Sequence, residues 1–209
     1  MTDDPGSIDL VTSDGLTLEA ELRIPGDPWA RAVVCHPHPQ YGGDMHAPVN
    51  AAMFTSLVAA GAAALRFNFR GAGRSEGAFD HGRGERLDVT AAVERLVSAT
   101  PEVPLLVAGW SFGADVAAAV GHPAIDGWFL VAAPMVTVPA DDIVAATSEK
   151  PKQLVVPGND QFRSPESASE LVADWPATTT EVVAGADHFL AGRTNEVSRL
   201  LELFARALA

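Results

Sequence analysis

The sequence predicts an α/β fold with a doubly wound, mostly parallel sheet of about eight strands, on three observations. Short apolar segments typical of buried strands alternate with longer amphipathic segments typical of helices. The first two strand-like segments, 7–12 and 16–24, are separated only by a Ser-Asp-Gly turn, which indicates an antiparallel N-terminal hairpin. Only about twenty residues separate the apolar segments at 127–132 and 153–157, too few for a lid domain.

The other elements are predicted from the same patterns, and together they indicate a single domain over residues 1–209. The remaining strands are short, apolar and often followed by glycine or proline, and are expected at 31–36, 62–69, 104–109, 127–134, 152–158 and 178–185. Helices have apolar residues at three- to four-residue steps, and are expected at 49–61, 84–99, 112–121, 165–175 and from about Leu190 to the end.

Composition and charge restrict the compartment and the partners. The net charge is −13, which argues against nucleic acid and against an anionic membrane surface as partners. No uninterrupted apolar stretch reaches the roughly 20 residues that a membrane span needs. The acidic start lacks the layout of a secretory signal, so a cytoplasmic monomer or homodimer is expected. The single cysteine, Cys35, falls in an apolar strand and is interpreted as a buried structural thiol.

A candidate nucleophile stands where the strand at 104–109 gives way to a helix. The sequence there is Gly-Trp-Ser-Phe-Gly, with Ser111 between Gly109 and Gly113. A sharp turn at this point would present the serine hydroxyl at the carboxyl edge of a parallel sheet, where ligands bind. Small residues two positions before and after the serine would let the backbone pass close to its neighbours. The pattern therefore predicts that Ser111 is a nucleophile.

A serine hydroxyl needs a base, and the base needs an acid that orients it. His188 follows the last predicted strand and is therefore expected at the same edge of the sheet. Asp160 follows the preceding strand and is the favoured acid. Its rival, Asp187, adjoins His188 in sequence, and neighbouring side chains normally diverge. The predicted catalytic residues are thus Ser111, Asp160 and His188.

That chain order resembles the α/β-hydrolase superfamily, which uses nucleophile, acid and base in this sequence. The resemblance extends over nearly the whole length and includes His-Pro-His-Pro at 36–39 and the Gly-rich turn at 68–77. The turn is similar to the family's Asp-x-Arg-Gly-x-Gly-x-Ser motif, with Asn68 in place of the aspartate. Arg70, Arg74 and Ser75 are interpreted as residues that fix this loop. The short segment between the strands at 127–132 and 153–157 and the His-Pro-His-Pro run resemble those of small lidless bacterial hydrolases near the dienelactone hydrolase branch.

The resemblance also implies an oxyanion hole made of two backbone N–H groups. The residue after the nucleophile, Phe112, would supply one. The family pattern laid over residues 36–38 indicates the N–H of His38 as the other, while Tyr41 and Gly42 remain alternatives. Three further residues border the predicted site, and each is interpreted either as pocket lining or as core: Trp110, Met135 and Phe162.

The predicted function is a cofactor-free serine hydrolase of a small-molecule ester or related acyl compound, similar to a carboxylesterase or thioesterase. A metal site at His36 and His38, with His46 nearby, is the competing interpretation of the His-Pro-His-Pro segment, but no third ligand is evident. Two other classes stay open because fold does not dictate reaction. One is a non-hydrolytic enzyme of the same fold, catalysing acyl transfer, perhydrolysis or a lyase reaction. The other is an inactive binding module.

Overall fold

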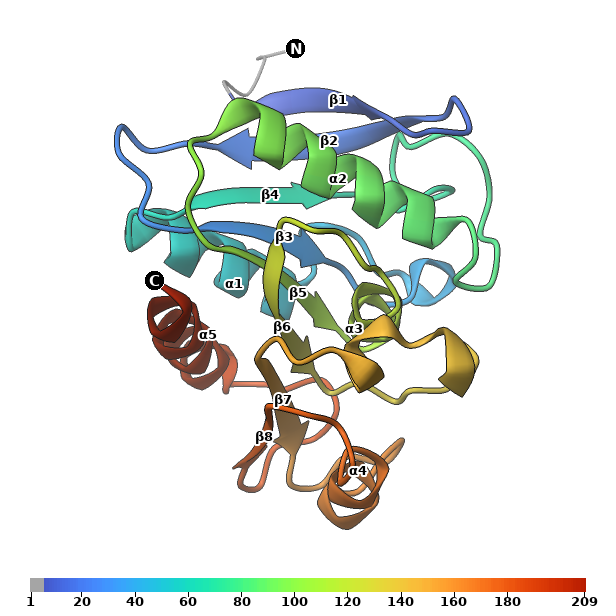
Figure 1. Ribbon diagram of the computed structural model, residues 1–209. Helices are drawn as coiled ribbons and strands as arrows, with labels where there is room; N and C mark the ends of the chain where they lie inside the picture. Colours follow the sequence, from blue (N-terminus) through green and yellow to red (C-terminus); the bar gives the residue numbers. More distant parts are fainter. Residues whose placement is uncertain (1–5) are drawn as a thin grey trace.

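The structure, a computed structural model, describes residues 6–209 and has one eight-stranded sheet with helices on both faces (Figure 1). The strands are β1 (Ser7–Val11), β2 (Thr17–Arg23), β3 (Arg31–Cys35), β4 (Ala63–Phe67), β5 (Leu105–Trp110), β6 (Ile125–Val131), β7 (Lys152–Pro157) and β8 (Thr178–Val183). The helices are α1 (Pro48–Ala59), α2 (Glu85–Ala99), α3 (Phe112–Ala118), α4 (Pro165–Leu171) and α5 (Thr194–Leu208). Within the described range, none of the helices is long and apolar enough to cross a membrane.

The predicted fold class is confirmed by the strand order β1-β2-β4-β3-β5-β6-β7-β8. β1 pairs with β2 and β2 with β4 in antiparallel fashion, whereas every other neighbouring pair is parallel. The segment between β6 and β7 holds two 3-10 helices, Ala140–Asp142 and Val144–Thr147, and no inserted domain. The carboxyl ends of β3 to β8 consequently meet at one open edge of the sheet, which is where ligands bind in such folds.

Two apolar layers sandwich the sheet, because successive side chains of a buried strand point to opposite faces. On β3, Val33 and Cys35 pack into the layer beneath α2 and α3, whereas Ala32 and Val34 pack into the layer beneath α1 and α5. Cys35 is fully buried, as predicted, and burial raises the pKa of its thiol far above the usual range. This cysteine is therefore a core side chain without nucleophilic character.

The last helix begins later than predicted. α5 starts at Thr194 and not near Leu190, because the backbone of Leu190 has φ 53° and that of Gly192 has φ 71°. Both values lie in the left-handed region, which a right-handed helix cannot include. The side chain of Leu190 is nevertheless fully buried in the layer beneath α1 and α5. The residues from His188 to Arg193 thus form a fixed loop at the sheet edge and not a first helical turn.

Ion pairs and buried hydrogen bonds fix the loop that follows β4, in agreement with the predicted role of its arginines. The Arg70 guanidinium donates to Asp88 on α2 at 2.7 Å and to Asp14 of the first hairpin at 2.9 Å. Asn68 donates from Nδ2 to Glu19 on β2 at 2.8 Å. Glu19 thus supplies from a neighbouring strand the carboxylate that the related motif carries at position 68.

Candidate active site

Ser111 lies in the sharp turn between β5 and α3, as predicted, and is half-buried. Its backbone has φ 55° and ψ −123°, a conformation that a residue with a Cβ rarely adopts. Strain of this kind costs about 1–3 kcal/mol and persists only where the surrounding structure imposes it. The turn aims the hydroxyl away from the sheet, at the carboxyl edge.

The two glycines that flank Ser111 are required by the closeness of neighbouring backbone. A Cβ on Gly109 would lie 2.4 Å from the carbonyl oxygen of Gly113. A Cβ on Gly113 would lie 2.4 Å from the carbonyl oxygens of both Cys35 and His36. Gly109 therefore permits the turn itself, whereas Gly113 lets the turn pack directly against the end of β3. The sequence pattern predicts the first contact but not the second.

Three side chains from the ends of three strands form a continuous hydrogen-bonded chain. His188, after β8, has its Nε2 2.9 Å from the Ser111 Oγ. Its Nδ1 lies 2.9 Å from Oδ2 and 3.1 Å from Oδ1 of Asp160, which follows β7. Because a carboxylate only accepts, Nδ1 carries the proton and Nε2 accepts from the serine hydroxyl. His188 and Asp160 are both buried, so water competes little with these bonds.

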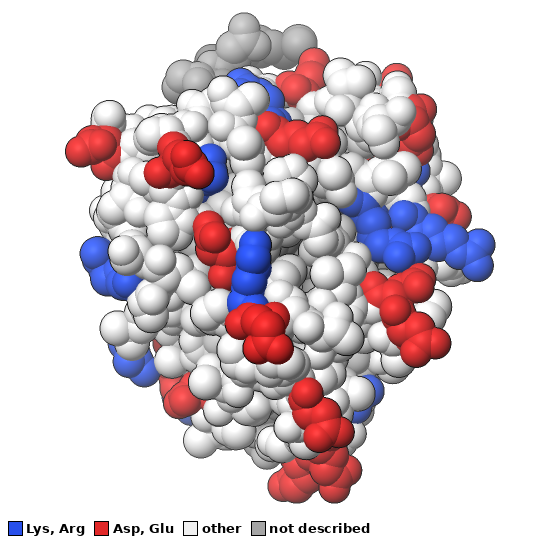
Figure 2. Space-filling view, viewed as in Figure 1, with Lys and Arg blue, Asp and Glu red and all other residues white. Residues whose placement is uncertain are grey.

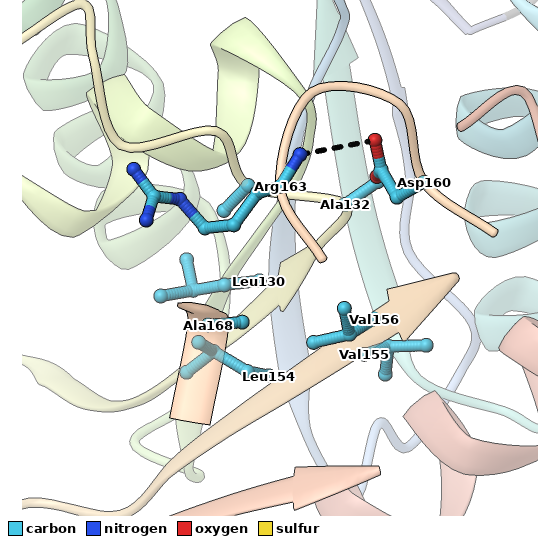
Figure 3. Close-up of a pocket in the computed structure, with 9 residues that line it drawn as sticks. Leu130, Ala132, Leu154, Val155, Val156, Asp160, Arg163 and Ala168 are labelled. Atoms are coloured by element: carbon cyan, nitrogen blue, oxygen red, sulfur yellow. Dashed lines mark hydrogen bonds between the residues drawn. The ribbon is translucent and has the colours of Figure 1, made fainter. Parts of the chain in front are cut away.

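Asp187, the alternative acid, lies outside this chain. Its carboxylate accepts a hydrogen bond from the Phe189 N–H at 3.1 Å, and its side chain is exposed. Asp160 is instead held in a tight turn in which Oδ1 accepts from the N–H of Phe162 at 2.8 Å and from that of Arg163 at 3.4 Å. Figure 3 shows the second of these bonds. The carboxylate is consequently oriented by backbone groups of its own turn, independently of its bond to the imidazole.

A second buried aspartate, which the sequence analysis does not single out, fixes the loop after β6. Asp115, on the first turn of α3, accepts hydrogen bonds from the N–H groups of Met135, Val136 and Thr137 at 2.8, 3.0 and 3.1 Å. Burial raises the pKa of its carboxyl. Arg163, from the acid turn, donates through Nε to the Pro134 carbonyl at 2.7 Å. The loop after β6 thus connects the helix behind Ser111 to the turn that carries Asp160.

The loop after β3 is anchored by His36, which is fully buried. Its Nε2 accepts from the Phe69 N–H at 2.9 Å, and its Nδ1 donates to the Pro37 carbonyl at 2.6 Å. Burial lowers the pKa of His36 to about 4. Asn50 on α1, with its amide oriented to satisfy both neighbours, donates to the Cys35 carbonyl and accepts from the His36 N–H, each at 3.1 Å.

The three candidate donors of this loop differ in availability. The Gly42 N–H donates to the Pro39 carbonyl at 3.3 Å. The Tyr41 N–H already donates to the His38 carbonyl at 3.1 Å, and the Tyr41 side chain is largely exposed. The His38 N–H donates to no acceptor within residues 6–209. The Phe112 N–H belongs to the first residue of α3, where no acceptor exists inside the helix. The rings of His38 and Phe112 lie 5.0 Å apart, so the two segments adjoin.

The three predicted lining residues occupy different positions. Trp110 is buried, and its Nε1 donates to the His188 carbonyl at 3.2 Å, which fixes the backbone of that residue. Met135 is buried beneath the loop after β6 and has φ 51°. Phe162 is 62% exposed while its ring centroid lies 4.4 Å from that of His188. Phe162 is therefore the one of the three that presents an open apolar surface beside the imidazole.

The metal interpretation fails at His36, because both of its ring nitrogens already bind backbone groups. A metal ligand must offer a free nitrogen lone pair. Over residues 6–209, no group of three or more His, Cys, Asp or Glu side chains is placed to hold a metal ion. The segment at 36–39 is instead a braced loop.

Comparison with known proteins places this geometry in a family. The family model described as "Serine aminopeptidase, S33" matches residues 28–195. An uncharacterized protein of Rickettsia prowazekii is 33% identical over 180 residues, covering 81% of this chain and 76% of that protein. An α/β serine hydrolase homologue from Coxiella burnetii is 29% identical, with a TM-score of 0.83 over 100% of this chain and 99% of that one. A serine hydrolase without a lid from Xanthomonas campestris has a TM-score of 0.86 at 24% identity, covers 99% of this chain and 96% of its own, and shares the fold.

Proposed function

We propose that this chain, which belongs to the serine aminopeptidase S33 family of α/β hydrolases, cleaves an ester or related acyl bond through an acyl-enzyme on Ser111. The observation that carries the proposal is the hydrogen-bonded chain from Ser111 through His188 to Asp160, with both links at 2.9 Å. A hydroxyl, an imidazole and a carboxylate in this arrangement form a nucleophile, a base and an orienting acid.

In the proposed reaction, His188 Nε2 takes the hydroxyl proton as Ser111 Oγ attacks the substrate carbonyl carbon. Asp160, itself held by the Phe162 N–H, stabilises the imidazolium that forms. The imidazolium then gives its proton to the departing alcohol or thiol, which leaves the acyl group on Ser111. Water, deprotonated by His188, attacks the acyl-enzyme and restores the free serine.

The oxyanion formed in both steps is assigned to the backbone N–H groups of Phe112 and His38. The first is unpaired inside its helix, and the second has no other acceptor in the described part of the chain. Donors held rigidly where negative charge develops stabilise the transition state more than the substrate. The Gly113 contact supports this assignment, because it brings the turn of Ser111 against the strand that leads to His38.

A fluorophosphonate probe tests the nucleophile directly, because it reacts only with an activated serine. Wild-type protein should be labelled at one site, and Ser111→Ala should abolish both labelling and turnover of an activated ester. Ser98→Ala is the matched control, since Ser98 is exposed on α2 and bonds only to its own helix. Full labelling of Ser111→Ala, or none of wild type, would remove Ser111 from the mechanism.

A substrate panel then separates the reaction classes. Esters, thioesters and aminoacyl anilides are assayed together, the last because the family description names an aminopeptidase. We expect ester or thioester turnover to dominate. Transfer to an added alcohol or to hydrogen peroxide in preference to water would instead assign a non-hydrolytic activity. Absence of both labelling and turnover would assign a binding role.

A further inference from the structure

A pocket of about 190 Å³ with cationic walls lies beside the proposed active site. One wall is the loop that precedes α2 and the first turn of that helix, with His81, Arg83 and Arg86, and the other is formed by residues 137–139 and Asp142 after β6. We call it the arginine pocket. It belongs to the open edge of the sheet, because both of its walls follow the carboxyl ends of strands.

A short series of ring contacts connects the arginine pocket to the nucleophile turn. The His81 ring lies 4.7 Å from that of Phe79. The Phe79 ring lies 5.6 Å from that of Phe112, the residue that follows Ser111, and 4.7 Å from that of His38. Phe112 itself is buried, whereas His38 and Phe79 are partly exposed and His81 is exposed. A substrate attacked at Ser111 can therefore extend over these last three rings and place its far end between the pocket walls.

The charge of the arginine pocket is opposite to that of the chain. The protein has a net charge of −13, yet Figure 2 shows basic side chains gathered beside the start of α2, with acidic side chains below them. The N-terminal end of a helix disfavours positive charge, because the free N–H groups there carry partial positive charge. Arg83 and Arg86 therefore stand where the helix dipole opposes them.

Only one of these arginines has a carboxylate partner in the described chain. Arg86 Nη1 lies 3.2 Å from Asp142 Oδ2, at the pocket rim. The exposed Arg83 guanidinium has no ion pair within residues 6–209. Arg83 is thus a cation placed against a helix N-terminus with no acidic residue of its own, a placement that an anionic ligand would explain.

The loop that carries Arg83 is held rigidly. Glu85 is fully buried, and its carboxylate accepts from the N–H groups of Asp80 and Gly82, each at 2.8 Å. A Cβ on Gly82 would lie 3.0 Å from the Thr137 methyl, so the two walls touch at their base. The pocket is consequently formed before any ligand binds, which reduces the entropy lost on binding.

We propose that the arginine pocket binds an anionic group of the substrate, a carboxylate or phosphate remote from the scissile bond, so that the enzyme prefers acidic acyl esters. This specificity rests on the proposed function of Ser111. The planar fork of Arg83 suits bidentate recognition of either anion, and Arg86 adds a second positive charge beside it. An uncharged substrate of the same length would leave the Arg83 guanidinium in water, while Arg86 keeps its Asp142 partner.

The test compares two matched esters. One is a 4-nitrophenyl hemiester of a linear dicarboxylic acid, and the other is its methyl ester, which lacks only the charge; chain length is varied from six to ten carbons. For the chain length that fits, kcat/KM of the acidic ester should exceed that of the neutral ester about tenfold or more. Arg83→Glu should reverse this preference, and Arg83→Lys should retain part of it.

The control is Arg199→Gln, an exposed arginine of α5 on the opposite face of the sheet, which should leave the ratio unchanged. Equal loss of both esters in Arg83→Glu, or no charge preference in wild type at any length, overturns the proposal. Inorganic phosphate should compete with the acidic ester alone. Inhibition of both esters through Arg83 would assign the pocket to a free anion and overturn the substrate role.

Binding to Ser111→Ala, measured by calorimetry with the acidic hemiester, separates this proposal from the proposed function. If binding depends on Arg83 but the wild-type protein turns over neither ester, the anion-binding role of the arginine pocket stands and the hydrolytic role is rejected. If the wild-type protein turns over the neutral ester but the acidic ester binds no more tightly than the neutral one, the hydrolytic role stands and the anion-binding role is rejected.

Discussion

His36 and His188 are both buried at the carboxyl edge of the sheet, and each uses both ring nitrogens, yet their partners differ in kind. His36 binds the Phe69 N–H and the Pro37 carbonyl, which are backbone groups that cannot exchange a proton. His188 binds the Ser111 hydroxyl and the Asp160 carboxylate, which can. Burial alone therefore does not make a histidine functional. The chemistry of its two partners distinguishes the anchor His36 from His188, which we propose as the base.

The largest effect should come from removal of the His188 ring. We expect His188→Ala to lower kcat/KM on an activated ester about a thousandfold or more, because members of such a triad act as a unit. Thermal unfolding is measured beside activity, because Asp160 loses its imidazole partner while the Trp110 bond to the His188 carbonyl survives the substitution. A variant that keeps a tenth of the activity would break the comparison, because His188 would then be no more than a second anchor.

The corresponding change at His36 should act on stability first. His36→Ala leaves the buried Phe69 N–H and Pro37 carbonyl without partners, and we expect a loss of about 3 kcal/mol in the free energy of unfolding. Denaturant unfolding measures this loss. His36→Gln, whose amide can both donate and accept, should recover part of it. Full stability in His36→Ala would show that the anchor role is wrong.

Lowering the pH should reveal the buried anchor His36 through its effect on the free energy of unfolding. The pKa of His36 is lowered by burial from 6.5 to about 4, so the unfolded chain takes up a proton that the folded chain does not. This contribution is neutral above about pH 6.5 and destabilises progressively as the pH falls toward 4, by up to about 3 kcal/mol. Unfolding followed from pH 7 to 4.5 should show a shallower loss in His36→Gln than in wild type, and equal slopes would contradict it.

The smallest effect is expected at His38, whose proposed role uses the backbone N–H and not the ring. His38→Ala should lower turnover about tenfold or less, mainly by removing ring contacts with Phe79 and Phe112. Turnover is measured with and without a chelator. A loss comparable to that of His188→Ala would give the His38 imidazole a direct part in the reaction, and chelator sensitivity of the wild type would revive the metal interpretation.

Strand periodicity and position along the chain were sufficient to predict the sheet and the approximate place of the candidate site. Alternating apolar segments indicated the strands and the antiparallel hairpin, and the ends of parallel strands indicated one common edge. Ser111, Asp160 and His188 each come after a strand, so their approach could be expected before any distance was known. Asp187 could be set aside because side chains adjacent in sequence normally diverge.

Other features depend on contacts between segments distant in sequence, and no local pattern reveals them. The bonds from Asp115 to the loop after β6, and the supply of a carboxylate to Asn68 by Glu19, require knowledge of which loops adjoin. The late start of α5 has a similar cause, since Leu190 takes a left-handed conformation while its side chain stays in the core. An apolar residue next to a helical pattern is assigned to that helix unless the loop geometry is known.

The packing of Gly113 against the carbonyl groups of Cys35 and His36 has a consequence for laboratory evolution of this protein. Any larger residue at 113 would push the turn of Ser111 away from the end of β3. Any larger residue at 109 would collide with the Gly113 carbonyl within the same turn. Selection for new substrates should therefore leave both positions as glycine. It should accumulate changes at exposed sites such as Phe162 and Arg83, where side chains meet solvent and a substitution leaves the turn of Ser111 in place.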